Sequence, residues 1–129
     1  MPLYHVWFAT KRRKWLLMGE IAEEVEEQLK TMAEEKEIKL LECETMVDHV
    51  HLLVDCADRA HLGRAMNLLK GASARRMFQR YPGMKLEAGV NNFWQHRYRA
   101  KEVPATAAAA VGGYIRTQWD RLEKYERQH

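Results

Sequence analysis

The apolar and polar residues of the chain follow two different periods, and each change of period marks a predicted element. Residues 4–11 (YHVWFATK) are rich in aromatic and β-branched side chains and predict a strand that ends in the basic run 11–14. After Gly19, apolar residues recur at helical spacing while glutamates cover the opposite face. We therefore expect a first helix that packs on a core through Ile21, Val25, Leu29 and Met32.

Residues 38–47 (IKLLECETMV) and 49–55 (HVHLLVD) predict two further strands, with Asp48 alone between them. This spacing leaves a tight turn, a bulge, a kink and a hairpin with a longer strand open. Side chains alternate across a strand, so one face of the second segment carries His49, His51 and Leu53. The other face, expected to point towards the helices, carries Val50, Leu52 and Val54.

A second helix is predicted from an N-cap at Asp58 to about Tyr81, where Pro82 and Gly83 end it. Its inner face is predicted to consist of Leu62, Ala65, Met66, Leu69, Ala72 and Met77. Its outer face is strongly basic and consists of Arg64, Lys70, Arg75, Arg76 and Arg80. The helix is therefore expected to offer a positive surface to solvent.

The C-terminal third predicts a loop around residues 89–92, a strand at 93–100 (FWQHRYRA), and a helix from Pro104 to about Tyr125. The apolar seam of this last helix consists of Val111, Ile115, Trp119 and Leu122. Glycines 112–113 each cost about 1 kcal/mol inside a helix. The helix is therefore expected to begin late or to kink there.

The order of these elements predicts an α+β fold. It is a ferredoxin-like, or RRM-like, antiparallel sheet with two helices on one face and an additional C-terminal helix that carries Tyr114. With 129 residues, 47% of them apolar, the chain is expected to form one domain, 1–129, with its own core. One face of such a sheet stays free of the two crossover helices, so a site can be built there.

The expected location of the protein and its two cysteines say little about its function. No apolar stretch approaches the length of a bilayer span, and the first residues lack the pattern of a signal peptide, so we expect a cytoplasmic protein with no membrane partner. Cys43 and Cys56 lack metal-site spacing and are expected to be reduced core residues.

Charge is segregated along the chain. Residues 20–37 hold eight acids and two bases, which leaves nineteen bases against ten acids elsewhere. A basic surface favours a polyanion, most simply a nucleic acid, although solvated basic faces are common. The expected phosphate contacts are Arg12, Arg13, Lys14, Lys70, Arg75, Arg76, Arg97, Arg99 and Lys101. Trp94 and Tyr98 are expected to stack on bases, with a core position as the alternative for Trp94.

His49 and His51 lie on one strand face with Cα atoms roughly 7 Å apart, so both rings can turn towards one divalent ion. Two half-exposed polar residues on an outer sheet face are the alternative. Tyr114 and Gln118 share a helix face, where the amide could complete the ion's shell and the hydroxyl could point at a bound phosphate. A core tyrosine with an exposed glutamine is the alternative. The remaining histidines, expected to be structural or exposed, are His5, His61, His96 and His129.

Four strings follow one another along nearly the whole chain: DHVHLLV, LLKGASARRMFQRYP, FWQHRY and YIRTQ. In this combination the chain resembles the single-tyrosine HUH transposases, small enzymes that move bacterial insertion sequences as single-stranded DNA. The resemblance implies that His49, His51 and Gln118 bind Mg²⁺ or Mn²⁺ and that Tyr114 is the nucleophile that forms a 5′-phosphotyrosine. It also implies a homodimer, DNA with hairpin ends as the partner, and strand transfer without a nucleotide cofactor.

The segment WQHRYRAKEV departs from the insertion-sequence pattern and is closer to the REP-associated tyrosine transposases. A resident nuclease that acts on palindromic repeats is therefore one alternative. A module that binds single-stranded nucleic acid without catalysis is another. A two-histidine phosphoesterase is disfavoured, because it needs a second histidine motif that the sequence lacks.

Overall fold

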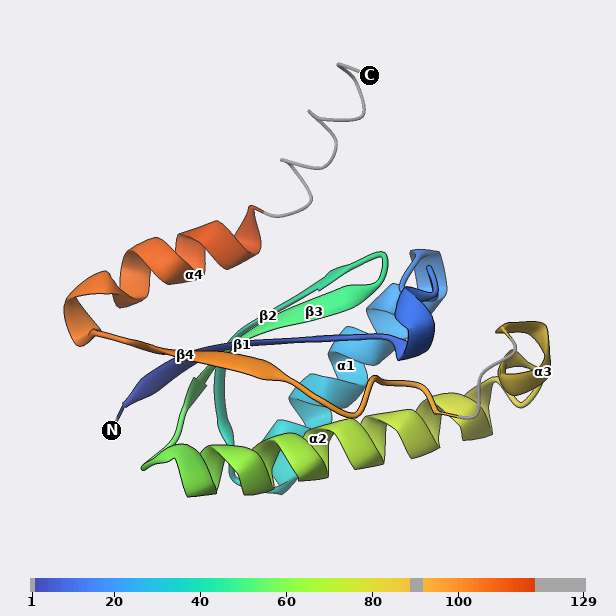
Figure 1. The fold of residues 1–129 in the computed structure, drawn as a ribbon, viewed down its shortest axis with the longest axis horizontal. Helices are drawn as coiled ribbons and strands as arrows, with labels where there is room; N and C mark the ends of the chain where they lie inside the picture. The colour runs from blue at the N-terminus through green and yellow to red at the C-terminus, as the bar shows by residue number, and fades with distance from the viewer. Residues whose placement is uncertain (1, 89–91, 118–129) are drawn as a thin grey trace, which may run out of the picture.

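The computed structural model describes residues 2–88 and 92–117, and its main elements follow the predicted order (Figure 1). The strands are β1 (Leu3–Ala9), β2 (Lys39–Met46), β3 (His49–Asp55) and β4 (Arg99–Val103). The helices are α1 (Gly19–Glu35), α2 (Arg59–Arg80), α3 (Met84–Ala88) and α4 (Ala108–Arg116). Short 3-10 turns are formed by Lys11–Arg13 and Ala105–Ala107.

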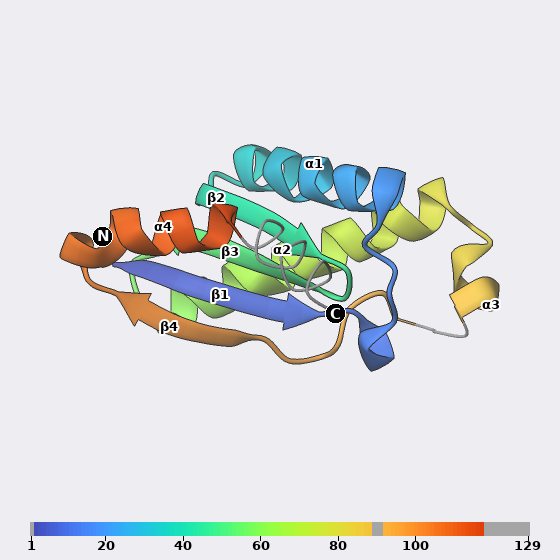
Figure 2. The same ribbon diagram turned by 90° about the horizontal axis from the view of Figure 1, so that it is seen from above.

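The four strands form one sheet in the order β2-β3-β1-β4, and each pair of neighbours is antiparallel. Helices α1 and α2 cover one face of the sheet, while α4 lies on the opposite face (Figures 1 and 2). The predicted ferredoxin-like arrangement with an additional C-terminal helix is confirmed. We call the face that carries α4 the open face.

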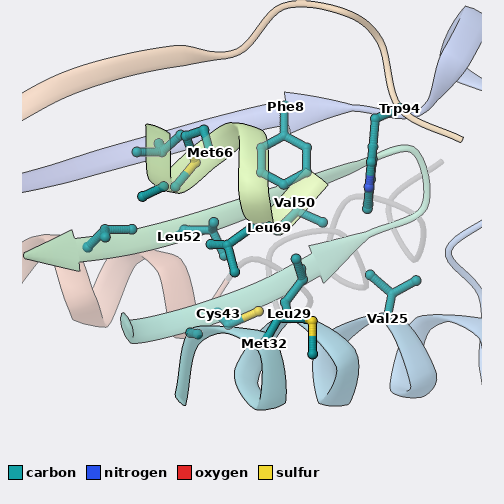
Figure 3. Packing of buried hydrophobic residues seen from close by; sticks show 14 of the residues in the cluster. Phe8, Val25, Leu29, Met32, Cys43, Val50, Leu52, Met66, Leu69 and Trp94 are labelled. Atoms are coloured by element: carbon teal, nitrogen blue, oxygen red, sulfur yellow. The ribbon is translucent and has the colours of Figure 1, made fainter. Parts of the chain in front are cut away.

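The main core fills the layer between the sheet and the helices α1 and α2 (Figure 3). Val50, Leu52 and Val54 of β3 are fully buried in this layer, as the alternation of the strand predicted. Each side chain of this size stabilises the fold by about 1.5–3 kcal/mol when it leaves water. Cys43 and Cys56 are free thiols that are also buried in this core, and burial raises the pKa of Cys43 to about 12.

A second, smaller apolar cluster holds α4 on the open face. It is built from Leu53 of β3, Val103 of β4 and Ile115 of α4, with Leu3 and Val111 packed against it. Because this cluster is separate from the main core, the position of α4 depends on few side chains.

Two predicted details are decided by the structure. The β2–β3 connection, for which four alternatives were open, is a tight turn at Val47 and Asp48. The predicted N-cap of α2 is confirmed, because the Asp58 carboxylate accepts a hydrogen bond from the backbone N–H of His61 at 2.8 Å.

The strand predicted at 93–100 is wrong as far as residue 98, because β4 begins at Arg99. Phe93 and Trp94 are consecutive and yet both buried, whereas a strand would turn them to opposite faces. The Trp94 indole N–H donates to Ser73 Oγ of α2 at 2.9 Å. The segment is therefore fixed by core packing against α2. Beside β1 it forms an isolated bridge, between Trp94 and Thr10, and a backbone hydrogen bond from Gln95 to Ala9 rather than a strand.

The region around the last helix also differs from the prediction. Helix α3 lies in part of the chain where only a turn and a loop were expected. Pro104 precedes a 3-10 turn, and α4 itself begins at Ala108, after the predicted start at Pro104. Because α4 includes Gly112 and Gly113, the expectation that the helix begins at these glycines is wrong. The predicted continuation to Tyr125 lies outside the described residues, and none of the described helices is long and apolar enough to cross a membrane.

Candidate functional site

Antiparallel pairing of the two central strands gathers three histidines on the open face. The register places Trp7 opposite His51 and Ala9 opposite His49, so alternate residues of β1 and β3 share this face. His5 belongs to the same face of β1 and lies opposite Leu53. The three imidazoles therefore come from two strands that are far apart in the sequence.

These rings form a continuous chain of contacts that begins at a carboxylate. His49 Nδ1 lies 2.7 Å from Asp48 Oδ1, the Nε2 atoms of His49 and His51 are 3.1 Å apart, and His51 Nδ1 lies 3.0 Å from His5 Nε2. Each of the two predicted ligands thus turns one nitrogen towards its neighbour and has a polar partner at the other nitrogen.

The separation of the two Nε2 atoms fits a shared metal ion. Nitrogen ligands about 2.1 Å from one ion stand about 3.0 Å apart at right angles and about 3.4 Å apart in a tetrahedron. The observed 3.1 Å between His49 and His51 falls within this range. No set of three His, Cys, Asp or Glu side chains within residues 2–88 and 92–117 could hold an ion together. A third protein ligand would be of another type, such as the predicted Gln118, which lies outside the described residues.

Electrostatics favour the neutral imidazoles that a metal needs. Burial, followed by the charges of His49 and His5, lowers the pKa of His51 to about 4. Burial, followed by the charge of Lys101, lowers the pKa of His5. At neutral pH both rings therefore carry a lone pair that can accept a hydrogen bond or bind a cation.

Asp48 is the charged partner of this chain of rings. Burial opposes its ionisation, but the hydrogen bond from His49 and the charge of Arg13 hold the pKa of Asp48 below its usual value. Its second oxygen, Oδ2, accepts from Arg13 Nε at 3.0 Å. The carboxylate is therefore fixed from both sides.

A strained turn after β1 brings Arg13 to Asp48. Arg12 and Arg13 have φ angles of 57° and 51°, in the left-handed region that side chains rarely adopt. Thr10 fixes this turn, since its hydroxyl donates to the carbonyl of Lys14 at 2.7 Å. The Arg13 side chain is 59% exposed, so its remaining N–H groups face the solvent beside the histidines.

The structure brings the predicted tyrosine to the histidines within one chain. Tyr114 is 40% exposed, and its ring centroid lies 6.2 Å from those of both His5 and His51. Arg116, two residues further along α4, donates to Glu42 of β2. A Cβ on Gly112 would lie 3.5 Å from the Glu42 carboxylate, an ordinary van der Waals contact, so α4 lies close to β2 without requiring a glycine there.

A cleft of about 630 Å³ opens beside these residues on the open face. Besides His49, His51 and Tyr114, its walls include the basic side chains of Arg13, Arg97 and Arg99 and the rings of Trp7 and Tyr98. A cleft with arginines around a histidine pair is suited to a phosphate bound next to a metal ion.

The predicted DNA contacts divide into two groups. Arg13, Arg97 and Arg99 line the cleft, and Arg12 and Lys14 are exposed in the adjoining turn. Lys70, Arg75 and Arg76 belong to α2, on the opposite side of the sheet (Figure 1). The side chains of α2 therefore lie across the sheet from the cleft, although Lys70 reaches the backbone of Gln95, which lines it.

The structure also gives some predicted contacts another role. The Lys70 ammonium donates to the carbonyl oxygens of Gln95 and Arg97 at 2.7 and 3.2 Å, and burial lowers its pKa. Arg76 donates to Gln28 and pairs with Glu35 of α1. Both side chains therefore tie parts of the protein together.

Trp94 as a base-stacking residue is contradicted by its position. It is 5% exposed and packs edge-on against Phe8 and Phe93, so no ring face is available to a base. The alternative of a core residue is confirmed. Trp7, which lines the cleft beside His51, is the better candidate for stacking.

His5, which was expected to be structural or exposed, contacts His51 and so belongs to the site. His61 lies in the first turn of α2 and His96 is exposed, as expected, whereas His129 lies outside the described residues. His5, Trp7 and Asp48 are the site residues that the sequence did not reveal. For His5 and Trp7 the available signal was their spacing of two residues in β1, which puts both side chains on the same face of the strand, the open face.

Comparisons with known proteins agree with this geometry. A family model described as IS200-like transposase matches residues 2–118. The ISDra2 transposase TnpA of Deinococcus radiodurans is 34% identical over 118 residues, which cover 92% of this chain and 84% of that protein. The transposase of insertion sequence element IS200 from Salmonella typhimurium is 29% identical over 115 residues, covering 89% and 75%.

Solved structures show the same fold. A presumed transposase from Deinococcus radiodurans R1 has a TM-score of 0.73 and 33% identity, covering 92% of each chain. A REP-associated tyrosine transposase bound to a REP hairpin has a TM-score of 0.61, covering 90% of this chain and 65% of that one. At 12% identity, this second likeness concerns the fold alone.

Proposed function

Because this chain belongs to the IS200-like transposase family, we propose that it is a metal-dependent transferase of single-stranded DNA. It would cleave and rejoin strands at the hairpin ends of an insertion sequence through a 5′-phosphotyrosine. The observation that carries this proposal is the convergence, within one cleft, of the two Nε2 atoms 3.1 Å apart and the Tyr114 ring 6.2 Å from that of His51.

Each group in the cleft has a task in this reaction. His49 and His51, with Gln118 as the family resemblance implies, would hold Mg²⁺ or Mn²⁺, which polarises a phosphate oxygen and offsets negative charge. Arg13, Arg97 and Arg99 would orient the scissile phosphate through its other oxygens. Trp7 would stack on a neighbouring base and thereby select a single strand.

Tyr114 would supply the nucleophile. Its hydroxyl oxygen attacks phosphorus, the bond from phosphorus to the 3′ oxygen breaks, and the phenolic proton is passed on so that the leaving strand ends in a 3′-hydroxyl. The phosphotyrosine ester replaces one phosphodiester bond with another, so a second 3′-hydroxyl can reverse the step. No nucleotide cofactor is required for this exchange.

Exchange of two DNA ends requires two nucleophiles, and each chain has one Tyr114, so we propose a homodimer. The hairpin bound by the REP-associated neighbour supports a hairpin as the DNA partner of this fold. Sequence identity favours an insertion-sequence enzyme over a resident REP-type nuclease. This chain is 34% identical to the ISDra2 transposase and 12% identical to the REP-associated structure.

Labelled single-stranded DNA from the flanks of the gene tests the proposal. The purified protein with Mn²⁺ is expected to form a covalent adduct that survives denaturing electrophoresis. Tyr114→Phe should abolish the adduct, while Tyr81→Phe, at the remote end of α2, should retain it. An adduct of undiminished yield in Tyr114→Phe would refute Tyr114 as the nucleophile.

A further inference from the structure

We infer that His5 is a positioning residue that holds His51 in the tautomer required for metal binding. The inference rests on the proposed metal-dependent function and adds a residue from β1 to it. The contact that carries it joins His5 Nε2 and His51 Nδ1 at 3.0 Å.

Geometry separates this role from that of a metal ligand. The His5 nitrogen meets His51 at Nδ1, whereas the His49 nitrogen meets it at Nε2, 3.1 Å away. These two nitrogens lie on different sides of the His51 ring. His5 therefore contacts the side of His51 that faces away from an ion held between the two Nε2 atoms.

The tautomer follows from what a ligand must offer. A cation bound at His51 Nε2 needs the lone pair of that atom, so the ring proton must sit on Nδ1. Among the described residues, the hydrogen-bond partner of this Nδ1 is His5 Nε2. By accepting the Nδ1 proton, His5 directs the His51 lone pair towards the ion.

The same arrangement occurs a second time in the site. His49 donates its Nδ1 proton to Asp48 at 2.7 Å and likewise presents Nε2 to the ion position. Both predicted ligands thus have an acceptor behind them, a carboxylate for His49 and an imidazole for His51. Such outer partners orient the ring and typically change metal affinity by about 10–100-fold when they are removed.

The packing of His5 is consistent with an orienting role. The rings of His5 and His51 lie within 27° of a common plane with centroids 5.2 Å apart, so they meet edge to edge along the Nε2–Nδ1 contact. The Trp7 ring packs against His5 with a centroid distance of 5.0 Å and an interplanar angle of 44°. The near-coplanar arrangement aligns the His5 lone pair with the Nδ1–H of His51.

Two substitutions separate the hydrogen bond from the packing. His5→Leu removes the acceptor but keeps a side chain that suits a strand beside Leu53. His5→Gln keeps an oxygen acceptor without the imidazole. His96→Leu is the matched control, because His96 is an exposed histidine that does not line the cleft.

The first measurement is Mn²⁺ binding by calorimetry on the full chain. We expect His5→Leu to weaken binding by about 10–100-fold, His5→Gln to recover most of the loss, and His96→Leu to match the wild type. Unchanged affinity in His5→Leu overturns the inference. Equal losses in His5→Leu and His5→Gln also overturn it, because the imidazole itself would then be required.

The second measurement is ¹⁵N NMR of the imidazoles in the metal-free protein. In the wild type the His51 proton is expected on Nδ1, and in His5→Leu it should move in part to Nε2. An unchanged His51 tautomer in His5→Leu contradicts the inference even if affinity falls. A wild-type protein that binds no Mn²⁺ would instead contradict the proposed function, and the NMR result would still decide the role of His5.

Discussion

Truncation of Ile115 should release α4, the helix that carries Tyr114, without unfolding the domain. Ile115 is fully buried, and its cluster with Leu53 and Val103 is separate from the main core. Ile115→Ala removes three carbon atoms from this cluster. At about 0.8 kcal/mol for each buried carbon, the docking of α4 weakens by about 2.4 kcal/mol, which lowers the ratio of docked to undocked helix about 60-fold.

Hydrogen exchange and adduct formation test this estimate together. Amides of α4 in Ile115→Ala should exchange about 60-fold faster, and the covalent adduct with labelled DNA should form more slowly, while the melting temperature of the main core changes little. Leu69→Ala, equally buried but between α2 and the sheet, is the control and should lower the melting temperature instead. The reasoning is refuted if Ile115→Ala destabilises the whole domain as Leu69→Ala does, or if exchange in α4 is unchanged.

Further predictions concern the open face and its supports. Asp48→Asn should weaken Mn²⁺ binding by about 10–100-fold in calorimetry, because His49 loses its charged acceptor. Arg99→Ala should reduce the slope of DNA affinity against salt by about one, whereas Lys70→Met should lower the melting temperature and leave that slope unchanged. The pKa of His51 is lowered from 6.5 to about 4, so between these pH values the unfolded chain binds more protons than the folded chain. The free energy of unfolding of the metal-free protein should therefore fall as the pH drops from 6.5 to about 4. In His51→Leu this fall should be smaller.

The sequence was most informative where burial and period agree. In HVHLLVD, alternation predicted both the core-facing valines and the outward histidines, because a strand with one buried face tolerates no shift of register. The segment from Phe93 misled because its aromatic composition is typical of a strand. The neighbouring Phe93 and Trp94, both large and apolar, argued against a strand with one buried face, because such a strand would bury only one of them. In the structure both are buried.

The site was harder to predict than the fold because its contacts are not local. The contact between His5 and His51 joins residues 46 positions apart, and only the register of β1 on β3 brings them together. Asp48 seemed to be a mere connection, yet the turn that it forms directs its carboxylate at His49. Local pattern identifies which residues share a face, but it does not specify which neighbour completes each hydrogen bond.

The division of the molecule into two layers explains how the buried His51 is tolerated on a sheet face. Stability comes mainly from the apolar layer between the sheet and helices α1 and α2, which needs nothing from the open face. His51 is 8% exposed on that face, and its desolvation is offset in part by the contact of its Nδ1 with His5. Helix α4, with Tyr114, is held by a separate small cluster and by the contact between Arg116 and Glu42. The free energy that positions Tyr114 is therefore largely independent of the free energy that folds the domain.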